Sequence, residues 1–220
     1  MANKKLHGIS ANSREAALVY AAANSMIPEI KKLLVDGANA ERLVSGTTAL
    51  HTAASMGLTM AAKILIEAGQ DLDTLDKDKL TPLMRACSCG KAKGSQIALM
   101  LIDAGADVHY VRKSDEMTAL KYAAKDCSPA VLARLLESGA PVDGPRGTRQ
   151  TALVLAARAN SVDNLKMLLK HGADPSKKCK LPWAAGKTAA EVAEMEGRKK
   201  AAAYLGSIGL EPKSKQKNKK

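Results

Sequence analysis

The chain has almost no large aromatic side chains. Its 220 residues include no Phe, one Trp and four Tyr, although 46 % of them are hydrophobic. A core without rings must be built from Ala, Leu, Ile, Val and Met, and such side chains favour close helix–helix contacts over a thick sandwich of two β-sheets. The composition therefore predicts an all-α protein.

Long apolar runs and paired cysteines are also scarce. The longest purely apolar run is the six residues 97–102, far short of the roughly 20 needed to span a bilayer. No apolar stretch follows Lys4 and Lys5, so we expect no cleaved secretory signal. Four Cys residues in a chain of this length do not make a disulfide framework. These absences indicate a reducing intracellular compartment, the cytoplasm or alternatively the nucleus.

Catalytic and metal-binding patterns are missing as well. None of the four His residues lies four positions from another, and no Gly-x-Ser-x-Gly turn is present. Cys87 and Cys89 form the tightest cysteine pair, but a structural zinc needs two more soft ligands. A metal or redox role is the alternative, and we favour plain small residues at a helix end. We therefore expect a non-catalytic protein with no metal, no cofactor and no small-molecule substrate.

What the chain does contain is a repeat. Four similar heptapeptides begin at Thr48, Thr81, Thr118 and Thr151, and read TALHTAA, TPLMRAC, TALKYAA and TALVLAA. Weaker copies begin at Ala16 and Thr188. A Gly follows each start after 21 residues, except in the third unit, where Gly105 comes after 24 residues. The chain thus has six units in register, and the third carries a three-residue insertion.

The residues of one unit predict a pair of helices. The initial Thr can cap a helix, and Pro82 suits a first helical turn. Ala pairs such as Ala53 and Ala54 let neighbouring helices approach closely. A second apolar helix follows, and the Gly ends it in a left-handed turn. Neither helix can bury its apolar stripe alone, so stacked copies should form a solenoid of six helix-turn-helix units.

These motifs resemble the ankyrin repeat, which begins with a Thr-Pro-Leu-His-x-Ala-like segment and ends near Gly-Ala-Asp. The matches are Thr81-Pro-Leu, Thr48-Ala-Leu-His51, Gly105-Ala-Asp107 and Gly172-Ala-Asp174. The resemblance implies that His51 bonds the backbone between repeats. Lys79, Glu116 and Arg149 replace the glycine of the finger loop before each Thr, so those tips are expected to differ in shape. We divide the chain into an N-terminal extension at 1–13, an ankyrin-repeat solenoid at 14–210 and a basic disordered tail at 211–220.

The resemblance implies a protein-binding adaptor or scaffold that recognises a protein partner through a concave surface of fingers and first helices. The exposed positions of that pattern lie just before each Thr and seven or eight residues after it. They predict a protein-binding set: Ser45, Thr47, Ser55, Met56, Lys77, Asp78, Leu80, Ser88, Asp115, Met117, Lys125, Asp126, Thr148, Gln150 and Arg158.

The C-terminal end carries most of the charge. Residues 1–174 hold 22 basic and 18 acidic residues, whereas residues 175–220 hold 12 and 4. The insertion at 90–95 has two interpretations. It is either a solvated loop, or the start of a helix that has Ser95 as its N-cap and binds an anion through its backbone N–H groups. The predicted anion-binding residues are Lys91, Lys93, Lys177, Lys178, Lys180, Lys187, Arg198, Lys199, Lys200, Lys213, Lys215, Lys217, Lys219 and Lys220.

Two readings of this basic end stay open. It can serve an anionic partner of the adaptor, or it can contact RNA phosphate in a ribonucleoprotein assembly such as the ribosome. The scarcity of aromatic residues argues against reading of single-stranded bases by stacking.

Leu120→Asp should unfold the middle of the solenoid, because a buried charge without a partner costs several kcal/mol. The substitution would weaken the contacts with both neighbouring units. Ser114→Asp, at a finger tip, should change the free energy of unfolding by less than about 0.5 kcal/mol. Thermal melting followed by circular dichroism measures both variants, and equal effects would contradict the proposed register.

Overall fold

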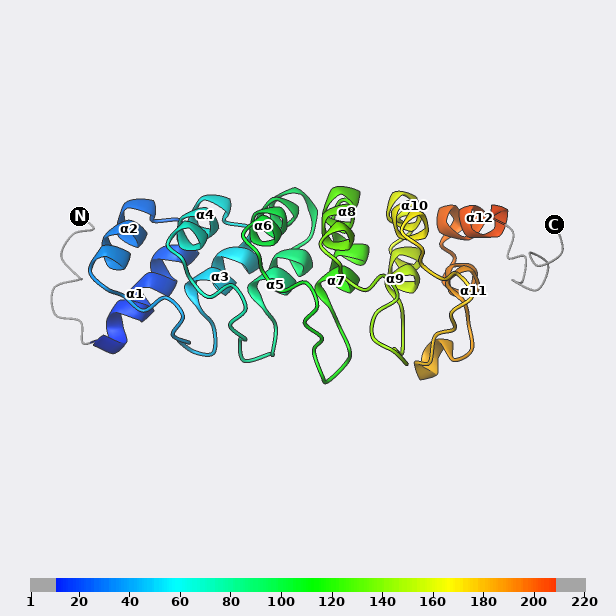
Figure 1. Ribbon diagram of the computed structural model, residues 1–220, viewed down its shortest axis with the longest axis horizontal. Coiled ribbons are helices and arrows are strands. Elements are labelled where there is room, and N and C mark those ends of the chain that lie inside the picture. The colour runs from blue at the N-terminus through cyan, green and yellow to red at the C-terminus, as the bar shows by residue number, and fades with distance from the viewer. Residues whose placement is uncertain (1–10, 209–220) are drawn as a thin grey trace.

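The computed structural model describes residues 11–208, which form twelve α-helices in six consecutive pairs (Figure 1). In chain order the helices are α1 (Ala11–Ala23), α2 (Ile27–Val35), α3 (Ala49–Met56), α4 (Thr59–Glu67), α5 (Pro82–Ser88), α6 (Lys91–Asp103), α7 (Ala119–Asp126), α8 (Pro129–Glu137), α9 (Ala152–Arg158), α10 (Val162–Lys170), α11 (Ala189–Met195) and α12 (Lys199–Ser207). A short 3-10 helix, η1 (Pro182–Ala184), precedes the last pair. The predicted tail lies outside the described residues.

The pairs stack in a row, with α1 and α12 at opposite ends (Figure 1). The first helices α1, α3, α5, α7, α9 and α11 form one layer, in which each contacts the next. The second helices contact one another in the same order in a parallel layer. The finger loops project from the opposite side of the first-helix layer (Figure 1). Within residues 11–208 there is no strand, only an isolated bridge between Val44 and Thr47, so the predicted all-α solenoid is confirmed.

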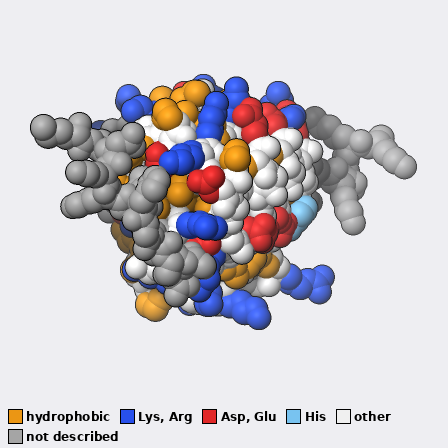
Figure 2. Space-filling model, turned by 90° about the vertical axis from the view of Figure 1, so that its left-hand side faces the viewer, with side chains coloured by type: hydrophobic (Ala, Val, Ile, Leu, Met, Phe, Trp, Pro, Cys, Tyr) orange, Lys and Arg blue, Asp and Glu red, His pale blue; other side chains and the backbone are white. Residues whose placement is uncertain are grey.

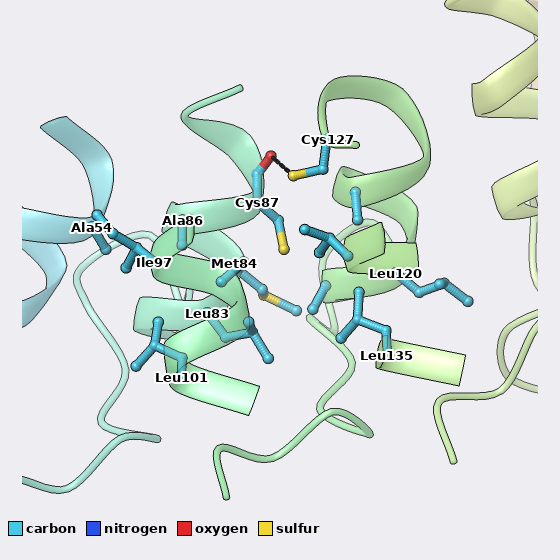
Figure 3. Packing of buried hydrophobic residues seen from close by; sticks show 14 of the residues in the cluster. Ala54, Leu83, Met84, Ala86, Cys87, Ile97, Leu101, Leu120, Cys127 and Leu135 are labelled. Carbon is cyan, nitrogen blue, oxygen red and sulfur yellow. Dashed lines mark hydrogen bonds between the residues drawn. The ribbon is translucent and has the colours of Figure 1, made fainter. Parts of the chain in front are cut away.

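Small side chains make up much of the core between units. Ala54, Ala86 and Ala123 are completely buried, and so are the larger Leu83 and Leu135 of neighbouring helices (Figure 3). Because Ala adds little bulk, successive first helices approach closely, and the longer Leu side chains fill the space toward the second helices. Each unit therefore buries its apolar face only because a neighbour covers it.

The cysteines belong to this core. All four thiols are free, and Cys87, Cys127 and Cys179 are buried. The Cys127 thiol donates a hydrogen bond to the Cys87 carbonyl oxygen at 3.3 Å, across the joint between the third and fourth units (Figure 3). Hydrogen bonding to Cys127 and burial raise the pKa of the Cys87 thiol well above its ordinary value. A protonated, enclosed thiol of this kind is chemically inert.

The Thr residues cap the first helices as the repeat predicts. The side-chain oxygens of Thr48, Thr81, Thr118 and Thr151 each accept a hydrogen bond from the backbone N–H three residues later. Thr188 does the same and forms a full capping box with Glu191, whose carboxylate accepts from the Thr188 backbone N–H at 2.7 Å. These bonds satisfy donors that a helix leaves free at its N-terminus.

His51 joins the second unit to the third. Its Nε2 lies 3.0 Å from the Leu80 carbonyl oxygen, and its Nδ1 lies 2.8 Å from the Thr48 hydroxyl. A carbonyl oxygen can only accept, so Nε2 carries the proton and Nδ1 accepts from the hydroxyl. Burial lowers the pKa of His51 and keeps the ring neutral. The expected backbone bond between repeats is confirmed.

Lys121 occupies the position of His51 two units later and is 1 % exposed. Its Nζ donates to the Glu116 carbonyl oxygen and to the Thr148 hydroxyl, both at 2.7 Å. The ammonium of Lys121 thus links the fourth unit to the fifth, as the imidazole of His51 links the second unit to the third. Burial lowers the pKa of Lys121 to about 8, although the nearby carboxylates of Glu116 and Asp115 oppose the shift.

The insertion in the third unit is a turn of helix rather than a loop. The N-cap of α6 is Gly90, and the helix starts at Lys91. The expected N-cap role of Ser95 is therefore wrong: Ser95 is buried within α6, where its hydroxyl accepts from the Ser128 backbone N–H at 3.2 Å. The added turn packs closely on α5, since a Cβ placed on Gly94 would lie 2.5 Å from the Ala86 carbonyl oxygen. Only glycine fits there without a shift of one helix.

Two of the three fingers without the usual glycine keep its backbone conformation. Lys79 and Glu116 have φ angles of 57° and 59°, close to the left-handed conformation of Gly46 at 81°. The expectation of a different tip is wrong at these two residues, which instead bear a local strain of about 1 kcal/mol each. The finger before Thr151 does differ, because its left-handed residues are Gly144 and Gly147.

Lys121→Met should abolish a specific pH dependence of stability. The pKa of Lys121 is lower in the folded state than the ordinary 10.5, so between these two values the unfolded chain binds more protons and stability rises with pH. We expect the parent to gain about 2 kcal/mol relative to Lys121→Met between pH 8 and pH 10. Urea unfolding of both proteins at each pH measures the difference. A constant difference across this range would contradict the proton linkage.

Candidate protein-binding surface

The finger loops and the exposed sides of the first helices form one continuous surface, here called the finger surface. Adjacent fingers are joined by hydrogen bonds to backbone carbonyl oxygens. The Lys77 N–H donates to Gly46 at 2.8 Å, and the Lys180 N–H donates to Arg149 at 2.7 Å. Arg149 Nη2 reaches Ser114 at 3.1 Å. Because each finger loop is hydrogen-bonded to the next, the loops are held in place before a partner binds.

Between the third and fourth fingers, side chains make the same kind of link. The Tyr110 hydroxyl donates to the Lys79 carbonyl oxygen at 3.2 Å, and Arg112 Nη1 donates to the Asp78 carbonyl oxygen at 3.4 Å. Arg112 also pairs with Asp115. Burial opposes ionisation of Asp115, but the hydrogen bond from Arg112 and the backbone outweigh it and lower the pKa of the carboxyl. The Arg112–Asp115 pair thus stays ionised at neutral pH.

The third finger is held by a buried carboxylate. Asp76 is 2 % exposed, and its Oδ1 accepts from the backbone N–H groups of Asp78 and Leu80. Arg85 bridges Asp76 and Asp78, with Nη2 at 2.5 Å from each carboxylate. The hydrogen bond from Arg85 lowers the pKa of Asp78. Sequence reasoning missed Arg85 and Arg112, although Arg85 lies at the helix position that Thr52 and Tyr122 occupy in neighbouring units.

Most of the predicted protein-binding residues reach the solvent. Those that are exposed are Ser45, Ser55, Met56, Lys77, Asp78 and Lys125, and those that are half-buried are Thr47, Ser88, Asp115, Met117, Asp126, Gln150 and Arg158. Their place on the finger surface agrees with the repeat register. Their role in binding stays a prediction.

Leu80 and Thr148 are corrections to the predicted set. Leu80 is 4 % exposed, because here the side chain turns into the core while the carbonyl oxygen accepts a hydrogen bond from His51. Thr148 is 8 % exposed and accepts from the Lys121 ammonium. Both residues hold units together and cannot face a partner.

The predicted anion-binding residues are partly engaged within the protein. Lys177 pairs with Asp143 at 3.1 Å, Lys180 Nζ donates to the Gly147 carbonyl oxygen at 3.1 Å, and Arg198 lies 3.4 Å from Glu196. Lys93, Lys178, Lys187, Lys199 and Lys200 are exposed. The side chain of Lys91 and the five tail lysines lie outside the described residues. Their joint action on an anionic partner stays a prediction.

The opposite end of the molecule, viewed from α1, carries interspersed side chains of both charges on the part of its face that is not grey (Figure 2). Across residues 11–208, no helix is long and apolar enough to cross a membrane. The described His, Cys, Asp and Glu side chains form no group of three or more that could hold a metal ion.

Comparison with known proteins identifies the repeat. A model of ankyrin repeats (three copies) matches residues 18–111 and 91–179. Neurogenic locus notch homolog protein 1 of Homo sapiens is 36 % identical over 130 residues, which are 59 % of this chain and 5 % of that protein. Ankyrin repeat and KH domain-containing protein mask-1 of Caenorhabditis elegans is 28 % identical over 161 residues, 72 % of this chain and 6 % of that protein. The chain thus matches only a small part of these relatives.

A solved structure has the same fold. A chain in the complex of Bd0816 predatory endopeptidase from Bdellovibrio bacteriovorus with immunity protein Bd3460 superposes with a TM-score of 0.75 at 24 % sequence identity, covering 88 % of this chain and 98 % of that one. Ankyrin repeats generally mediate protein–protein interaction, and proteins built from them are generally non-catalytic. The family model covers most of the solenoid, and the chain therefore belongs to the ankyrin-repeat family.

Proposed function

We propose that this protein is a non-catalytic adaptor that binds a protein partner along the finger surface, with the basic C-terminal end directed to an anionic part of that partner. The observation that carries the proposal is the chain of hydrogen bonds between fingers. Because these bonds hold the loops before a partner arrives, binding costs less conformational entropy than it would with free loops.

Exposed apolar side chains on the first-helix layer support the same function. Met56 at the end of α3 is 53 % exposed, and Tyr20 on α1 is 65 % exposed. Met117, next to the Thr118 cap, is half-buried on the fourth finger. Flexible Met side chains adapt to different surfaces and bury well against an apolar strip of a partner. The corrected strip therefore runs through Met56 and Met117, without Leu80.

The free Cys thiols are consistent with a protein that functions in a reducing intracellular compartment. None of the four Cys residues forms a disulfide, and three of them are buried. Proteins of oxidising compartments commonly use such residues in disulfides. The free thiols support our proposal that the adaptor works in the cytoplasm or the nucleus.

Met56→Glu should strongly reduce partner capture without loss of folding. A carboxylate introduced into the apolar strip would be buried without a partner on binding, so we expect at least about a tenfold loss of affinity. The matched control is Met60→Glu, because Met60 is 58 % exposed on α4 in the second-helix layer. Both variants should melt within about 0.5 kcal/mol of the parent.

The measurement is quantitative capture of proteins from a lysate of the source cells by the parent and both variants. A partner that is lost with Met56→Glu and kept with Met60→Glu supports binding at the finger surface. Equal capture by all three proteins would place the binding surface elsewhere.

A further inference from the structure

A pocket of about 490 Å³ opens on the finger surface between the fourth, fifth and sixth units. It is here called the Arg158 pocket, and its lining residues are Lys125, Asp126, Leu155, Arg158, Ala159, Glu196 and Arg198. The ends of α7 and α9 form two of its sides, and the turn between α11 and α12 forms the third. Sequence reasoning selected three of these residues as protein-binding from the repeat register alone.

Arg158 is held in one orientation from two sides. Its Nε donates to the Glu196 carboxylate at 2.7 Å, and its guanidinium carbon lies 4.3 Å from the centre of the Trp183 ring. An Arg side chain that packs on an aromatic face and pairs with a carboxylate loses most of its rotamer freedom before any ligand binds. The cost of ordering this side chain is thus already met in the free protein.

The pre-organised guanidinium keeps donors for a further anion. Of its five N–H groups, the one on Nε goes to Glu196, and within the described residues the two terminal nitrogens have no hydrogen-bond partner. Their parallel N–H bonds match the two oxygens of a carboxylate. Arg158 is half-buried, so such a pair would form partly out of water, where it is stronger than on an open surface.

The structure that fixes Arg158 is a local addition to the repeat. Thr188 comes 16 positions after Gly172, whereas Thr151 comes 12 positions after Gly139 in the unit before. The longer finger forms η1, which carries Trp183, the only Trp in the chain. Stacking of the units does not require this extra turn, and such additions to exposed loops are where binding residues accumulate.

The lining of the pocket favours a carboxylate over a phosphate. The Glu196 carboxylate is shared by Arg158 and Arg198, and Asp126 lies 3.6 Å from Lys125, so the pocket holds three cationic and two anionic side chains. One added negative charge balances this set, whereas a phosphate dianion would bring surplus charge close to two carboxylates. A polyanion such as RNA would meet the same repulsion at each phosphate near the pocket.

Apolar surface beside the pocket indicates what flanks the acidic group. Leu155, which is only 4 % exposed, and Ala159 contribute to its lining. The apolar side chains that reach water nearby are Trp183, which is 40 % exposed, and Met195, next to Glu196 in the chain, which is 51 % exposed. A free acetate-sized anion would leave these side chains in water, whereas leucine-sized side chains on either side of a carboxylate would cover them.

We propose that the Arg158 pocket binds the side-chain carboxylate of an acidic residue, flanked by apolar residues, in an extended segment of the protein partner. This inference rests on the proposed function and adds the chemistry that the partner presents to the fifth and sixth units. Arg158 is the anchor of the site, and Trp183 and Glu196 position its guanidinium.

Trp183 makes a direct test possible, because it is the only Trp in the sequence and its ring packs on Arg158, so its fluorescence reports on the surroundings of that side chain. The full chain is titrated with the peptide acetyl-Ala-Leu-Glu-Leu-Ala-amide and with its Gln counterpart, which has the same shape and no charge. We expect a saturable change with the Glu peptide and at least about tenfold weaker binding of the Gln peptide, the size of one charged hydrogen-bonded pair. Inorganic phosphate, added as a competitor, should displace the Glu peptide only weakly.

Variants of Arg158 identify the anchor. Arg158→Gln should weaken binding of the Glu peptide about tenfold or more, and Arg158→Lys should also weaken it because Lys keeps the charge but lacks the fork. The matched control is Arg134→Gln, since Arg134 likewise links two units through a carboxylate, with Nη2 2.7 Å from Asp103, but lies on α8 in the second-helix layer. Binding by the control should equal that of the parent.

Three results would overturn the proposal: equal binding of the Glu and Gln peptides, unchanged binding by Arg158→Gln, or displacement of the peptide by phosphate at lower concentration than the peptide itself requires. The last would assign the pocket to phosphate. The adaptor function is tested separately by Met56→Glu, so loss of the partner in that variant together with any of these three results would leave the adaptor function standing and remove only the carboxylate site.

Discussion

Burial of small apolar faces between neighbouring units is the interaction on which the rest of this structure depends. Ala53, Ala86 and Ala156 have no exposed surface, and each lies where one first helix meets the next. A single helix pair would leave these faces in water, where they contribute nothing to stability. The fold is therefore a property of the stack, and a change that opens one joint removes support from two units at once.

The polar links across the joints are more varied than the apolar ones. The same helix position holds His51 in the second unit and Lys121 in the fourth, and each side chain bonds the backbone or hydroxyl of an adjacent finger. In the last unit the position is Glu191, which closes a capping box with Thr188 within its own helix. One position of the repeat thus holds three different side chains, His51, Lys121 and Glu191, and each makes the hydrogen bond that its own surroundings allow.

A second series of hydrogen bonds between units also changes where the local residues differ. Asp73 accepts a hydrogen bond from the backbone N–H of Asp107 in the next unit at 2.9 Å, and Asp143 accepts from that of Asp174. Between these two links the donor position is occupied by Pro141, which has no N–H. The acceptor position facing it holds His109 rather than an acidic residue. The absence of a donor removes the need for a carboxylate at that position, and other hydrogen bonds, such as that of Ser128 with Ser95, still join the neighbouring units.

The proposed function rests on the rigidity that these links give to the fingers. Loops tied to their neighbours present side chains at set intervals, and the elongated last finger adds an aromatic side chain that orients Arg158. A binding surface of this kind gains specificity from the order in which apolar and charged residues follow one another along the stack.

The sequence by itself determined the fold, because the repeated Thr caps, Ala pairs and terminal Gly residues act within one unit or between adjacent units, and their spacing survives in the linear order. It also located the finger surface and the role of His51. It could not show that Leu80 and Thr148 are buried, that Ser95 lies inside a helix, or that Arg158 lies on Trp183. The burial of Leu80 and Thr148 and the contact of Arg158 with Trp183 arise where residues 25 or more positions apart meet, and the place of Ser95 follows from the packing of α6 on α5. Only the tertiary structure therefore decided which side chains stay exposed and which hold the stack together.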